Sequence, residues 1–262
     1  MASCFVGSVS LKGRVGVSSV CGRGVRRTSV VKMATSTGWG RTATEEELKT
    51  DLPKLFVYDH CQYCVRCRMV FGLRGEKYDL YFLSNDDAIT PTKMIGKKVL
   101  PILSIGGNAM GESMDIIAKI EGDRPALKPA TGRTDIKEWL AKTTGVQRML
   151  TRPRLAKTPL AEFQTKSSRE TYANNHKTYD EMLSKTDELL ASFNESLKEL
   201  EAMLDSDESV SPGGIGYDDI ELFPRIRGIT MVKGVEFPPK LKSYAEKMSE
   251  RCDIPLFYYC AS

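Results

Sequence analysis

Three cysteines lie close together in this sequence, and their spacing is the feature best suited to chemistry. Cys61 and Cys64 bound a Cys-Gln-Tyr-Cys motif, and Cys67 follows three residues later. A thiolate is the nucleophile of thiol–disulfide exchange, and a second thiol one helical turn away can attack the disulfide that the first one forms. The pair therefore indicates Cys61 as an attacking thiol and Cys64 as a resolving thiol.

The segments around Cys61 predict that this thiol lies at the start of a helix. Residues 55–58 form a short apolar run typical of a buried strand, and Val65, Met69 and Leu73 then recur at helical spacing. At a helix N-terminus, unpaired backbone N–H groups and the helix dipole stabilise negative charge. We therefore expect the pKa of Cys61 to be lowered, which makes this thiol reactive.

Two other interpretations of the cysteine cluster stay open on the residue pattern alone. A metal site would use Cys61, Cys64 and Cys67, but no second Cys/His cluster follows at zinc-ribbon spacing. Alternatively, the cysteines are small apolar fillers, which suits Cys67 on the inner side of the helix and suits Cys61 poorly. The strand–turn–helix context favours redox chemistry.

The following segments predict the rest of an α/β unit. Residues 78–83 have the pattern of a second strand, and a helix is expected over 90–95, with Thr90 as its cap and Pro91 at its first position. Residues 99–103 are apolar but contain Pro101, which a central strand accepts poorly. A cis peptide bond between Leu100 and Pro101 would explain this proline. Leu100 could then offer its N–H and C=O to an extended peptide ligand.

A hairpin and a third helix are expected next. Gly106 and Gly107 mark the hairpin turn, and the helix begins near Glu112 and Ser113. Ser113 would cap this helix, and it is also a natural seat for a ligand carboxylate.

Residues 54–121 resemble the thioredoxin-fold half of a glutaredoxin, and residues 53–260 are similar to the two-domain bacterial glutaredoxin-2 type, a relative of the glutathione transferases. Several dispersed segments carry this resemblance in order and spacing: 54–72 with the Cys61–Cys64 motif, 85–88, 90–92, 101–103 and 112–116.

The resemblance implies glutathione as co-substrate and assigns a role to each matching residue. Cys61 would be the nucleophile, with Tyr63 packed beside its sulfur. Leu100, before the cis Pro101, would pair its backbone with the cysteinyl unit of glutathione, while Glu112 and Ser113 would hold the γ-glutamyl end.

This chain departs from the family pattern at three positions. Gln62 stands where proline is usual, which is expected to alter the pKa or redox potential of the thiol. Leu100 replaces the more usual valine, and Cys67 replaces a small apolar residue.

The pattern becomes helical after a polar stretch that contains proline and glycine. We predict an α/β thioredoxin-like domain over 53–122, a linker over 123–132 and an all-α, glutathione-transferase-like domain over 133–262. Apolar residues at helical spacing predict one long helix over 172–204. Another helix is expected from residue 217, and the resemblance to the glutathione transferases implies its cap at Gly216, with Asp219 three residues on.

Residues 1–52 are predicted to be a transit peptide and disordered leader. Residues 1–44 contain seven basic and no acidic side chains, whereas the rest of the chain carries 31 basic and 34 acidic ones. This composition is typical of an organellar transit peptide, for the chloroplast stroma or, alternatively, the mitochondrion. The mildly acidic body argues against nucleic-acid binding, and no apolar stretch is long enough for a membrane span.

We therefore predict a dithiol glutaredoxin that uses glutathione to reduce disulfide-bonded and glutathionylated proteins. The chain is expected to act as a monomer without a metal. A glutathione transferase or dehydroascorbate reductase of the same fold is the main alternative. An iron–sulfur carrier that uses Cys61 is another.

Overall fold

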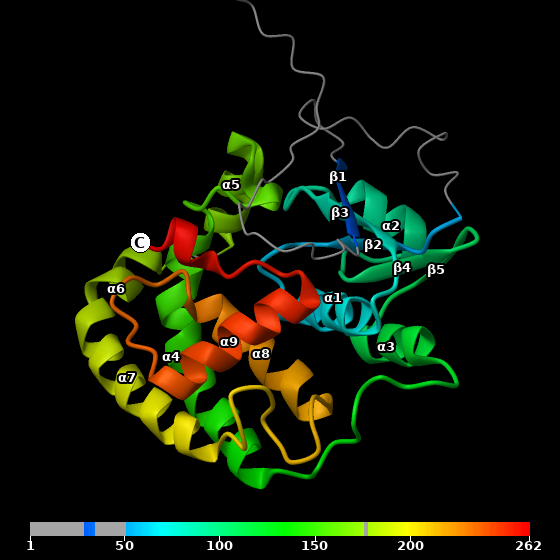
Figure 1. Cartoon of the computed structure of the whole chain (residues 1–262). Helices are drawn as coiled ribbons and strands as arrows, with labels where there is room; N and C mark the ends of the chain where they lie inside the picture. Colours follow the sequence, from blue (N-terminus) through cyan, green and yellow to red (C-terminus); the bar gives the residue numbers. More distant parts are fainter. Residues whose placement is uncertain (1–28, 35–50, 176–177) are drawn as a thin grey trace, which may run out of the picture.

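A five-stranded mixed sheet with flanking helices forms the N-terminal half of the molecule, and helices form the rest, as predicted (Figure 1). The computed structural model describes residues 29–34, 51–175 and 178–262. In spatial order the sheet is β1-β3-β2-β4-β5, with β2 parallel to β3 and antiparallel to β4. The strands are β1 (Ser29–Ala34), β2 (Lys54–Val57), β3 (Tyr78–Leu83), β4 (Ile102–Ile105) and β5 (Asn108–Met110).

Three helices cover the sheet, and alternate residues of its strands face different ones. In β2, Leu55 and Val57 belong to the large core that includes α1 (Gln62–Arg74) and α3 (Ser113–Glu121). Phe56 belongs to a smaller cluster under α2 (Ile89–Ile95), on the other face. Because both faces of the sheet are covered, successive residues of β2 are buried on opposite faces, which explains the uninterrupted apolar run at 55–57.

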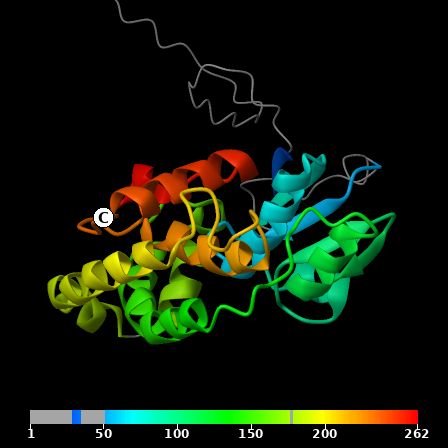
Figure 2. The same ribbon diagram turned by 60° about the horizontal axis from the view of Figure 1, so that its bottom comes forward.

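The C-terminal half consists of helices, two of which pack against α1. Helices α8 and α9 contact α1, so they form the junction between the two halves (Figures 1 and 2). Helix α4 packs along α7 farther from the sheet. The helical elements are α4 (Thr134–Leu155), α5 (Lys166–Asn174), α6 (Tyr179–Ser184), α7 (Thr186–Met203), α8 (Tyr217–Ile229) and α9 (Pro239–Cys252), with short 3-10 turns at Ala161–Phe163 and Phe257–Cys260. None of the described helices is long and apolar enough to cross a membrane.

The single long helix predicted over 172–204 is wrong. The chain forms α5, which ends at Asn174, and then the separate helices α6 and α7. Lys185 lies between α6 and α7 with φ −93° and ψ 5°, outside helical geometry. Helix α5 buries Tyr172 and α7 buries Phe193 and Leu197, whereas α6 has no buried residue. The apolar spacing in the sequence does not reveal these breaks.

Two predicted helix caps are also wrong by a few residues. Helix α2 begins at Ile89, and the Asp87 carboxylate, not Thr90, accepts hydrogen bonds from the backbone N–H groups of Ile89 and Thr90, both at 3.0 Å. Ser113 is the first residue of α3, and the cap position belongs to Glu112.

Strand β1 lies within the range predicted as the leader, and the residue pattern did not predict it. It pairs in parallel with β3, from Ser29 opposite Tyr78 to Ala34 opposite Leu83. The remainder of the predicted leader, residues 1–28 and 35–50, lies outside the described residues.

Gly216 occupies the cap of α8 because the linker passes directly over it. A Cβ at this position would lie 2.6 Å from the backbone oxygen of Lys128, which accepts a hydrogen bond from Tyr217. The Asp219 carboxylate accepts the Gly216 N–H at 2.8 Å and the Val210 N–H at 2.9 Å. The linker, the cap and the start of α8 are thus held together.

Helices α1 and α9 approach so closely at Gly72 that no side chain fits there. A Cβ on Gly72 would lie 2.5 Å from the backbone oxygen of Cys252. We expect Gly72→Ala to lower the free energy of unfolding by about 1–3 kcal/mol, because overpacking forces the backbones apart. Chemical denaturation followed by circular dichroism measures this change.

Gly145→Ala is the matched control for Gly72→Ala. Gly145 lies inside α4 with nothing within 4 Å of the position its Cβ would take. Alanine there should raise the free energy of unfolding by about 0.5–1 kcal/mol through helix propensity. Equal effects of the two substitutions would contradict the close approach at Gly72.

Candidate active site

The register of the sheet brings the predicted site residues to one edge. Phe56 near the end of β2 pairs with Ile102 at the start of β4, so Pro101 and Leu100 lie beside the residues that lead to Cys61. Strand β5 pairs with β4 in the opposite direction, with Met110 opposite Leu103. The chain therefore returns to the same edge just before α3 begins. The sheet therefore brings together the three segments that the resemblance assigns to glutathione, at residues 61–63, 100–101 and 112–113.

Cys61 is the N-cap residue of α1, where helix dipole and free N–H groups converge, as predicted. Its carbonyl accepts the Val65 N–H at 3.0 Å, and its φ and ψ of −73° and 118° are those of extended backbone. Cys61 is partly buried, whereas Cys64 is fully buried one turn further on. Both are free thiols.

The surroundings separate the acidities of the two cysteines. A hydrogen bond from the Cys64 thiol, the charge of His60 and the backbone N–H groups of Cys64 and Tyr63 together outweigh burial and lower the pKa of Cys61 to about 7. Burial and the hydrogen bond to Cys61 raise the pKa of Cys64 well above its ordinary value. Cys61 is therefore the thiolate near neutral pH, and Cys64 remains a thiol that can later lose its proton.

The rate at which iodoacetamide alkylates Cys61 should follow a titration centred near pH 7. Because the thiolate is the reacting form, the rate should rise with pH and reach half its plateau near the pKa of about 7. Peptide mapping by mass spectrometry resolves the modified cysteines. Cys260 is the internal control, because it is also partly exposed and burial raises its pKa above the ordinary value. A Cys61 midpoint no lower than that of Cys260 would contradict the account.

His60 and Glu162 belong to this site, and the residue pattern did not identify them. Glu162 lies in the 3-10 turn Ala161–Phe163, and its Oε1 is 2.6 Å from His60 Nδ1. The same oxygen accepts the backbone N–H of His60 at 3.0 Å. The imidazole immediately before Cys61 is thus held by a carboxylate from the helical half.

Asp59 anchors the other side of the loop through two buried arginines. Its carboxylate accepts hydrogen bonds from Arg68 at 2.6 Å and from Arg227 at 2.7 Å, and its carbonyl accepts a second hydrogen bond from Arg227 at 2.5 Å. Although burial raises the pKa of Asp59, the charges of Arg227 and Arg68 bring it below its ordinary value. Arg227 comes from α8, so both halves of the molecule hold the loop that carries Cys61.

The three predicted binding residues near Cys61 differ in exposure: Tyr63 is exposed, Leu100 is partly buried and Pro101 is buried. Tyr63 is 56% exposed, and the Arg66 guanidinium lies over its ring at 4.9 Å. The Leu100–Pro101 peptide bond is cis, as predicted. Neither the N–H nor the C=O of Leu100 has a hydrogen-bond partner among the described residues.

Glu112 and Ser113 begin α3, and Cys67 contacts this turn. Glu112 adopts a φ of 64°, which is unusual for a residue with a side chain, and its exposed carboxylate pairs with Lys97 at 2.8 Å. Ser113 is buried, and its carbonyl lies 3.7 Å from Cys67 Sγ. Cys67 is fully buried, and its pKa is raised by burial, which agrees with its interpretation as an apolar filler. Within 51–175 and 178–262, no three His, Cys, Asp or Glu side chains are grouped as metal ligands.

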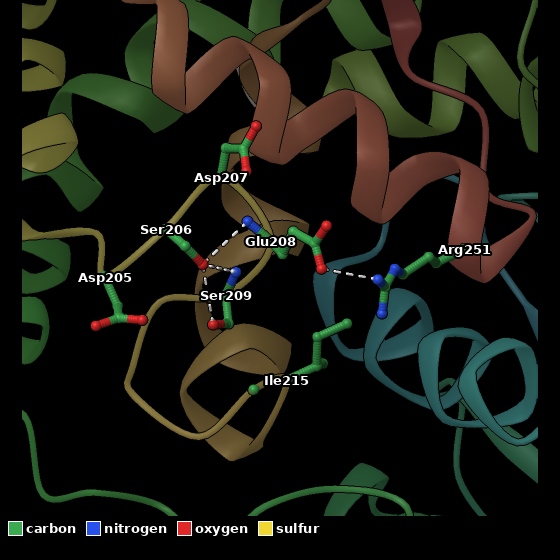
Figure 3. A pocket seen from close by; sticks show the side chains of 8 residues that line it. Asp205, Ser206, Asp207, Glu208, Ser209, Ile215 and Arg251 are labelled. Carbon is green, nitrogen blue, oxygen red and sulfur yellow. Dashed lines mark hydrogen bonds and ion pairs between the residues drawn. The ribbon is translucent and has the colours of Figure 1, made fainter.

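A shallow hollow of about 420 Å³ lies elsewhere, on the loop between α7 and α8 (Figure 3). Three acidic side chains, Asp205, Asp207 and Glu208, line it, and Glu208 pairs with Arg251 from α9. It contains none of the predicted site residues.

Comparisons with known proteins agree with this arrangement. Residues 135–261 match the family described as Glutaredoxin 2, C terminal domain, and residues 55–129 match the Glutathione S-transferase, N-terminal domain. Glutaredoxin 2 of Escherichia coli strain K12 is 36% identical over 213 residues, which cover 78% of this chain and 97% of that protein.

Solved structures give the same result. Glutaredoxin 2 from Salmonella typhimurium in complex with glutathione is 34% identical with a TM-score of 0.78, and the match covers 81% of this chain and 100% of that one. Glutathione transferase Omega 3C from Trametes versicolor, 16% identical with a TM-score of 0.50, shares the fold; the match covers 81% of this chain and 92% of that one. The chain belongs to the glutaredoxin 2 family.

Proposed function

We propose that this member of the glutaredoxin 2 family is a glutathione-dependent thiol–disulfide oxidoreductase whose nucleophile is Cys61. The main support for this assignment is the difference in acidity between the two cysteines of the Cys61–Cys64 motif. Cys61 has its pKa lowered to about 7 at a helix N-terminus, and Cys64 is buried with a raised pKa beside it. A thiolate with a pKa near the ambient pH is the best attacking group for this exchange.

The exchange proceeds by successive attacks of thiolate on disulfide. The Cys61 thiolate attacks the glutathione sulfur of a glutathionylated protein, forms a Cys61–glutathione disulfide and releases the protein thiolate, which takes a proton from solvent. A glutathione thiolate then attacks the glutathione sulfur of this intermediate, which regenerates the Cys61 thiolate and yields oxidised glutathione. One free glutathione is consumed for each protein thiol released, and the second half of the oxidised glutathione comes from the glutathionylated substrate.

A protein disulfide requires the second cysteine. Cys61 attacks one sulfur of the substrate and releases the other as a thiol. Cys64 then loses its proton and attacks Cys61, which frees the substrate and leaves a Cys61–Cys64 disulfide. Two glutathione molecules reduce this disulfide and leave as oxidised glutathione. The position of Cys64 one turn after Cys61 supports this role.

Glutathione binds along the edge that joins the cis Pro101 to the start of α3. Within the described part of the chain, neither the N–H nor the C=O of Leu100 is hydrogen-bonded, so both can pair with the cysteinyl backbone of the tripeptide. The first turn of α3, with Glu112 and Ser113, offers N–H groups to the γ-glutamyl carboxylate. Tyr63 is exposed and can pack beside the bound sulfur. The Salmonella relative was solved in complex with glutathione, which supports glutathione as the ligand.

A paired assay separates this function from that of a glutathione transferase. Purified protein is given a glutathionylated peptide with glutathione, glutathione reductase and NADPH, and in parallel 1-chloro-2,4-dinitrobenzene with glutathione. We expect NADPH oxidation that depends on the enzyme, with conjugation at the uncatalysed rate. Conjugation without disulfide reduction would favour the transferase alternative.

We also propose that the N-terminal segment, residues 1–52, directs the protein to the chloroplast stroma. Its support is the composition of residues 1–44, with seven basic and no acidic side chains. A fusion of residues 1–52 to a fluorescent protein should enter isolated chloroplasts and be shortened there. Import into mitochondria alone would support the alternative, and import into neither would refute the targeting proposal.

Disulfide-bonded and glutathionylated proteins are the proposed macromolecular substrates, and a monomer is the proposed working form. Light scattering of the purified protein should give the mass of one chain, and a dimer mass would contradict it. The same assay with a disulfide-bonded protein in place of the peptide tests the wider substrate class.

A further inference from the structure

A buried carboxylate from the helical half reaches the residue that precedes Cys61. Glu162 is fully buried, and its Oε1 contacts both the backbone N–H and Nδ1 of His60, at 3.0 and 2.6 Å. Its other oxygen, Oε2, has no hydrogen-bond partner among the described residues. A buried carboxylate is costly unless a cation or donors compensate it, and here His60 supplies that compensation.

Aromatic rings hold the His60 imidazole in place. The Tyr58 ring lies nearly parallel to it at 5.8 Å, and the Phe163 ring stacks on it at 5.5 Å. Tyr172 from α5 meets it edge-on at 5.8 Å. Tyr58 belongs to the sheet half, whereas Phe163 and Tyr172 belong to the helical half. The imidazole therefore lies at the junction and keeps one orientation while the two halves stay together.

We propose that Glu162 is a positioning residue that keeps the His60 imidazole charged and oriented beside Cys61, so that the helical half controls the reactivity of the catalytic thiol. The inference rests on the proposed function of Cys61. Burial lowers the pKa of His60, but the hydrogen bond and charge of Glu162, with the charges of Cys61 and Asp59, raise it overall. The charge of His60 in turn helps to lower the pKa of Cys61.

The other ionisable groups around His60 do not take over this role. Asp59 is already paired with Arg68 and Arg227. Tyr58 and Tyr172 have pKa values raised by burial, so they are neutral near pH 7. Tyr259, in the turn Phe257–Cys260, lies near Asp59 and Glu162, and burial raises its pKa too. Glu162 is therefore the carboxylate that holds the proton on His60.

The direction in which Glu162→Gln shifts the pKa of Cys61 shows whether Glu162 acts through His60 or directly on the thiol. The negative charge of Glu162 acting directly on Cys61 would raise the pKa of the thiol, so Glu162→Gln would lower it. If Glu162 instead acts through His60, the same substitution removes the carboxylate that stabilises the protonated imidazole. The pKa of Cys61 should then rise by about one unit. The alkylation rate at pH 7 would then fall about fivefold, since a thiol with a pKa near 8 is about one-tenth ionised there.

The experiment is a double-mutant cycle read by the pH dependence of Cys61 alkylation in the full chain. His60→Asn keeps a side-chain donor near Glu162 but carries no charge. We expect Glu162→Gln and His60→Asn each to raise the pKa of Cys61, and Glu162→Gln to produce no further rise in the His60→Asn background. An unchanged or lowered pKa in Glu162→Gln, or a further rise in the double variant, would overturn the proposal.

Glu221→Gln is the matched control, because it also removes a carboxylate that joins the two halves. Glu221 in α8 pairs with Arg66 in α1 at 2.5 Å. This variant should leave the pKa of Cys61 unchanged, and a rise equal to that of Glu162→Gln would show that loosening the junction suffices, against the proposal.

A second measurement decides the matter if Glu162→Gln fails to fold. The chain has only two histidines, so the His60→Asn spectrum assigns the imidazole signals in an NMR titration of the wild-type protein. His60 should remain protonated at pH 7, and a neutral imidazole there would overturn the proposal. None of these measurements depends on turnover. Failure of the proposed function would be detected by a different result, namely full activity in the Cys61→Ser variant.

Discussion

Cys61→Ser should lose glutathione-dependent disulfide reduction by at least about 10³-fold, the scale on which removal of a nucleophile acts in other enzymes. A serine hydroxyl does not ionise near pH 7, so the N–H groups at the start of α1 would have no thiolate to stabilise. The coupled assay with NADPH and a glutathionylated peptide measures the loss.

Cys64→Ser is the control for Cys61→Ser, because it alters the same motif but spares the nucleophile. It should still reduce glutathione mixed disulfides, which need one thiol, and lose the reduction of protein disulfides that proceeds through a Cys61–Cys64 disulfide. The serine hydroxyl can still donate a hydrogen bond to the Cys61 thiolate, so the pKa of Cys61 should stay lowered in this variant. An equal loss of activity toward both kinds of substrate in Cys64→Ser would contradict these separate roles of Cys61 and Cys64.

Arg227→Met should lower the free energy of unfolding by about 3–5 kcal/mol, because it breaks a buried ion pair and leaves its partner undercompensated. Arg227 is 1% exposed and donates to both the carboxylate and the carbonyl of Asp59. It also donates to the Pro255 carbonyl at 2.8 Å and lies 3.9 Å from the centre of the Phe257 ring. Denaturant unfolding of the full chain measures the change.

Lys142→Met serves as the comparison for Arg227→Met. Lys142 in α4 pairs with Glu199 in α7 at 3.0 Å, but both side chains are at least half exposed. Such a surface pair contributes less than about 1 kcal/mol. If Arg227→Met cost no more than Lys142→Met, the buried arginine would not be what holds the Cys61 loop to the helical half.

Local patterns predicted the elements around the motif because those elements are fixed by short-range sequence. The apolar run before Cys61 has buried neighbours on both faces, and the helical spacing after it matches α1. Pro101 inside an apolar run pointed to the cis peptide bond that the structure contains. In each case the signal and the structure lie within a few residues of each other.

The partners of the Cys61 loop were missed because they are distant in sequence. Glu162 lies 102 residues from His60, and Arg227 lies 168 residues from Asp59. Nothing in the pattern around these charged residues shows that they are buried, since burial depends on how the helical half docks on α1. A histidine directly before a reactive cysteine was the one available hint, and it carried no information about its carboxylate partner.

Helix boundaries were the other weakness, for a different physical reason. Several polar residues near a helix start compete for the same N–H groups, and Asp87 rather than Thr90 takes them in α2. At α3, the unusual φ of Glu112 moves the cap one residue before Ser113. Such competition is settled by tertiary geometry and cannot be read from residue type.

The most direct test of the account locates glutathione on the protein. The Cys64→Ser variant is incubated with oxidised glutathione, digested without reductant and mapped by mass spectrometry. We predict that glutathione is attached to Cys61 and released by added glutathione, while Cys260, which is also partly exposed, stays free. Glutathione on Cys260 in preference to Cys61, or no adduct at all, would contradict the claim that Cys61 is the catalytic thiolate.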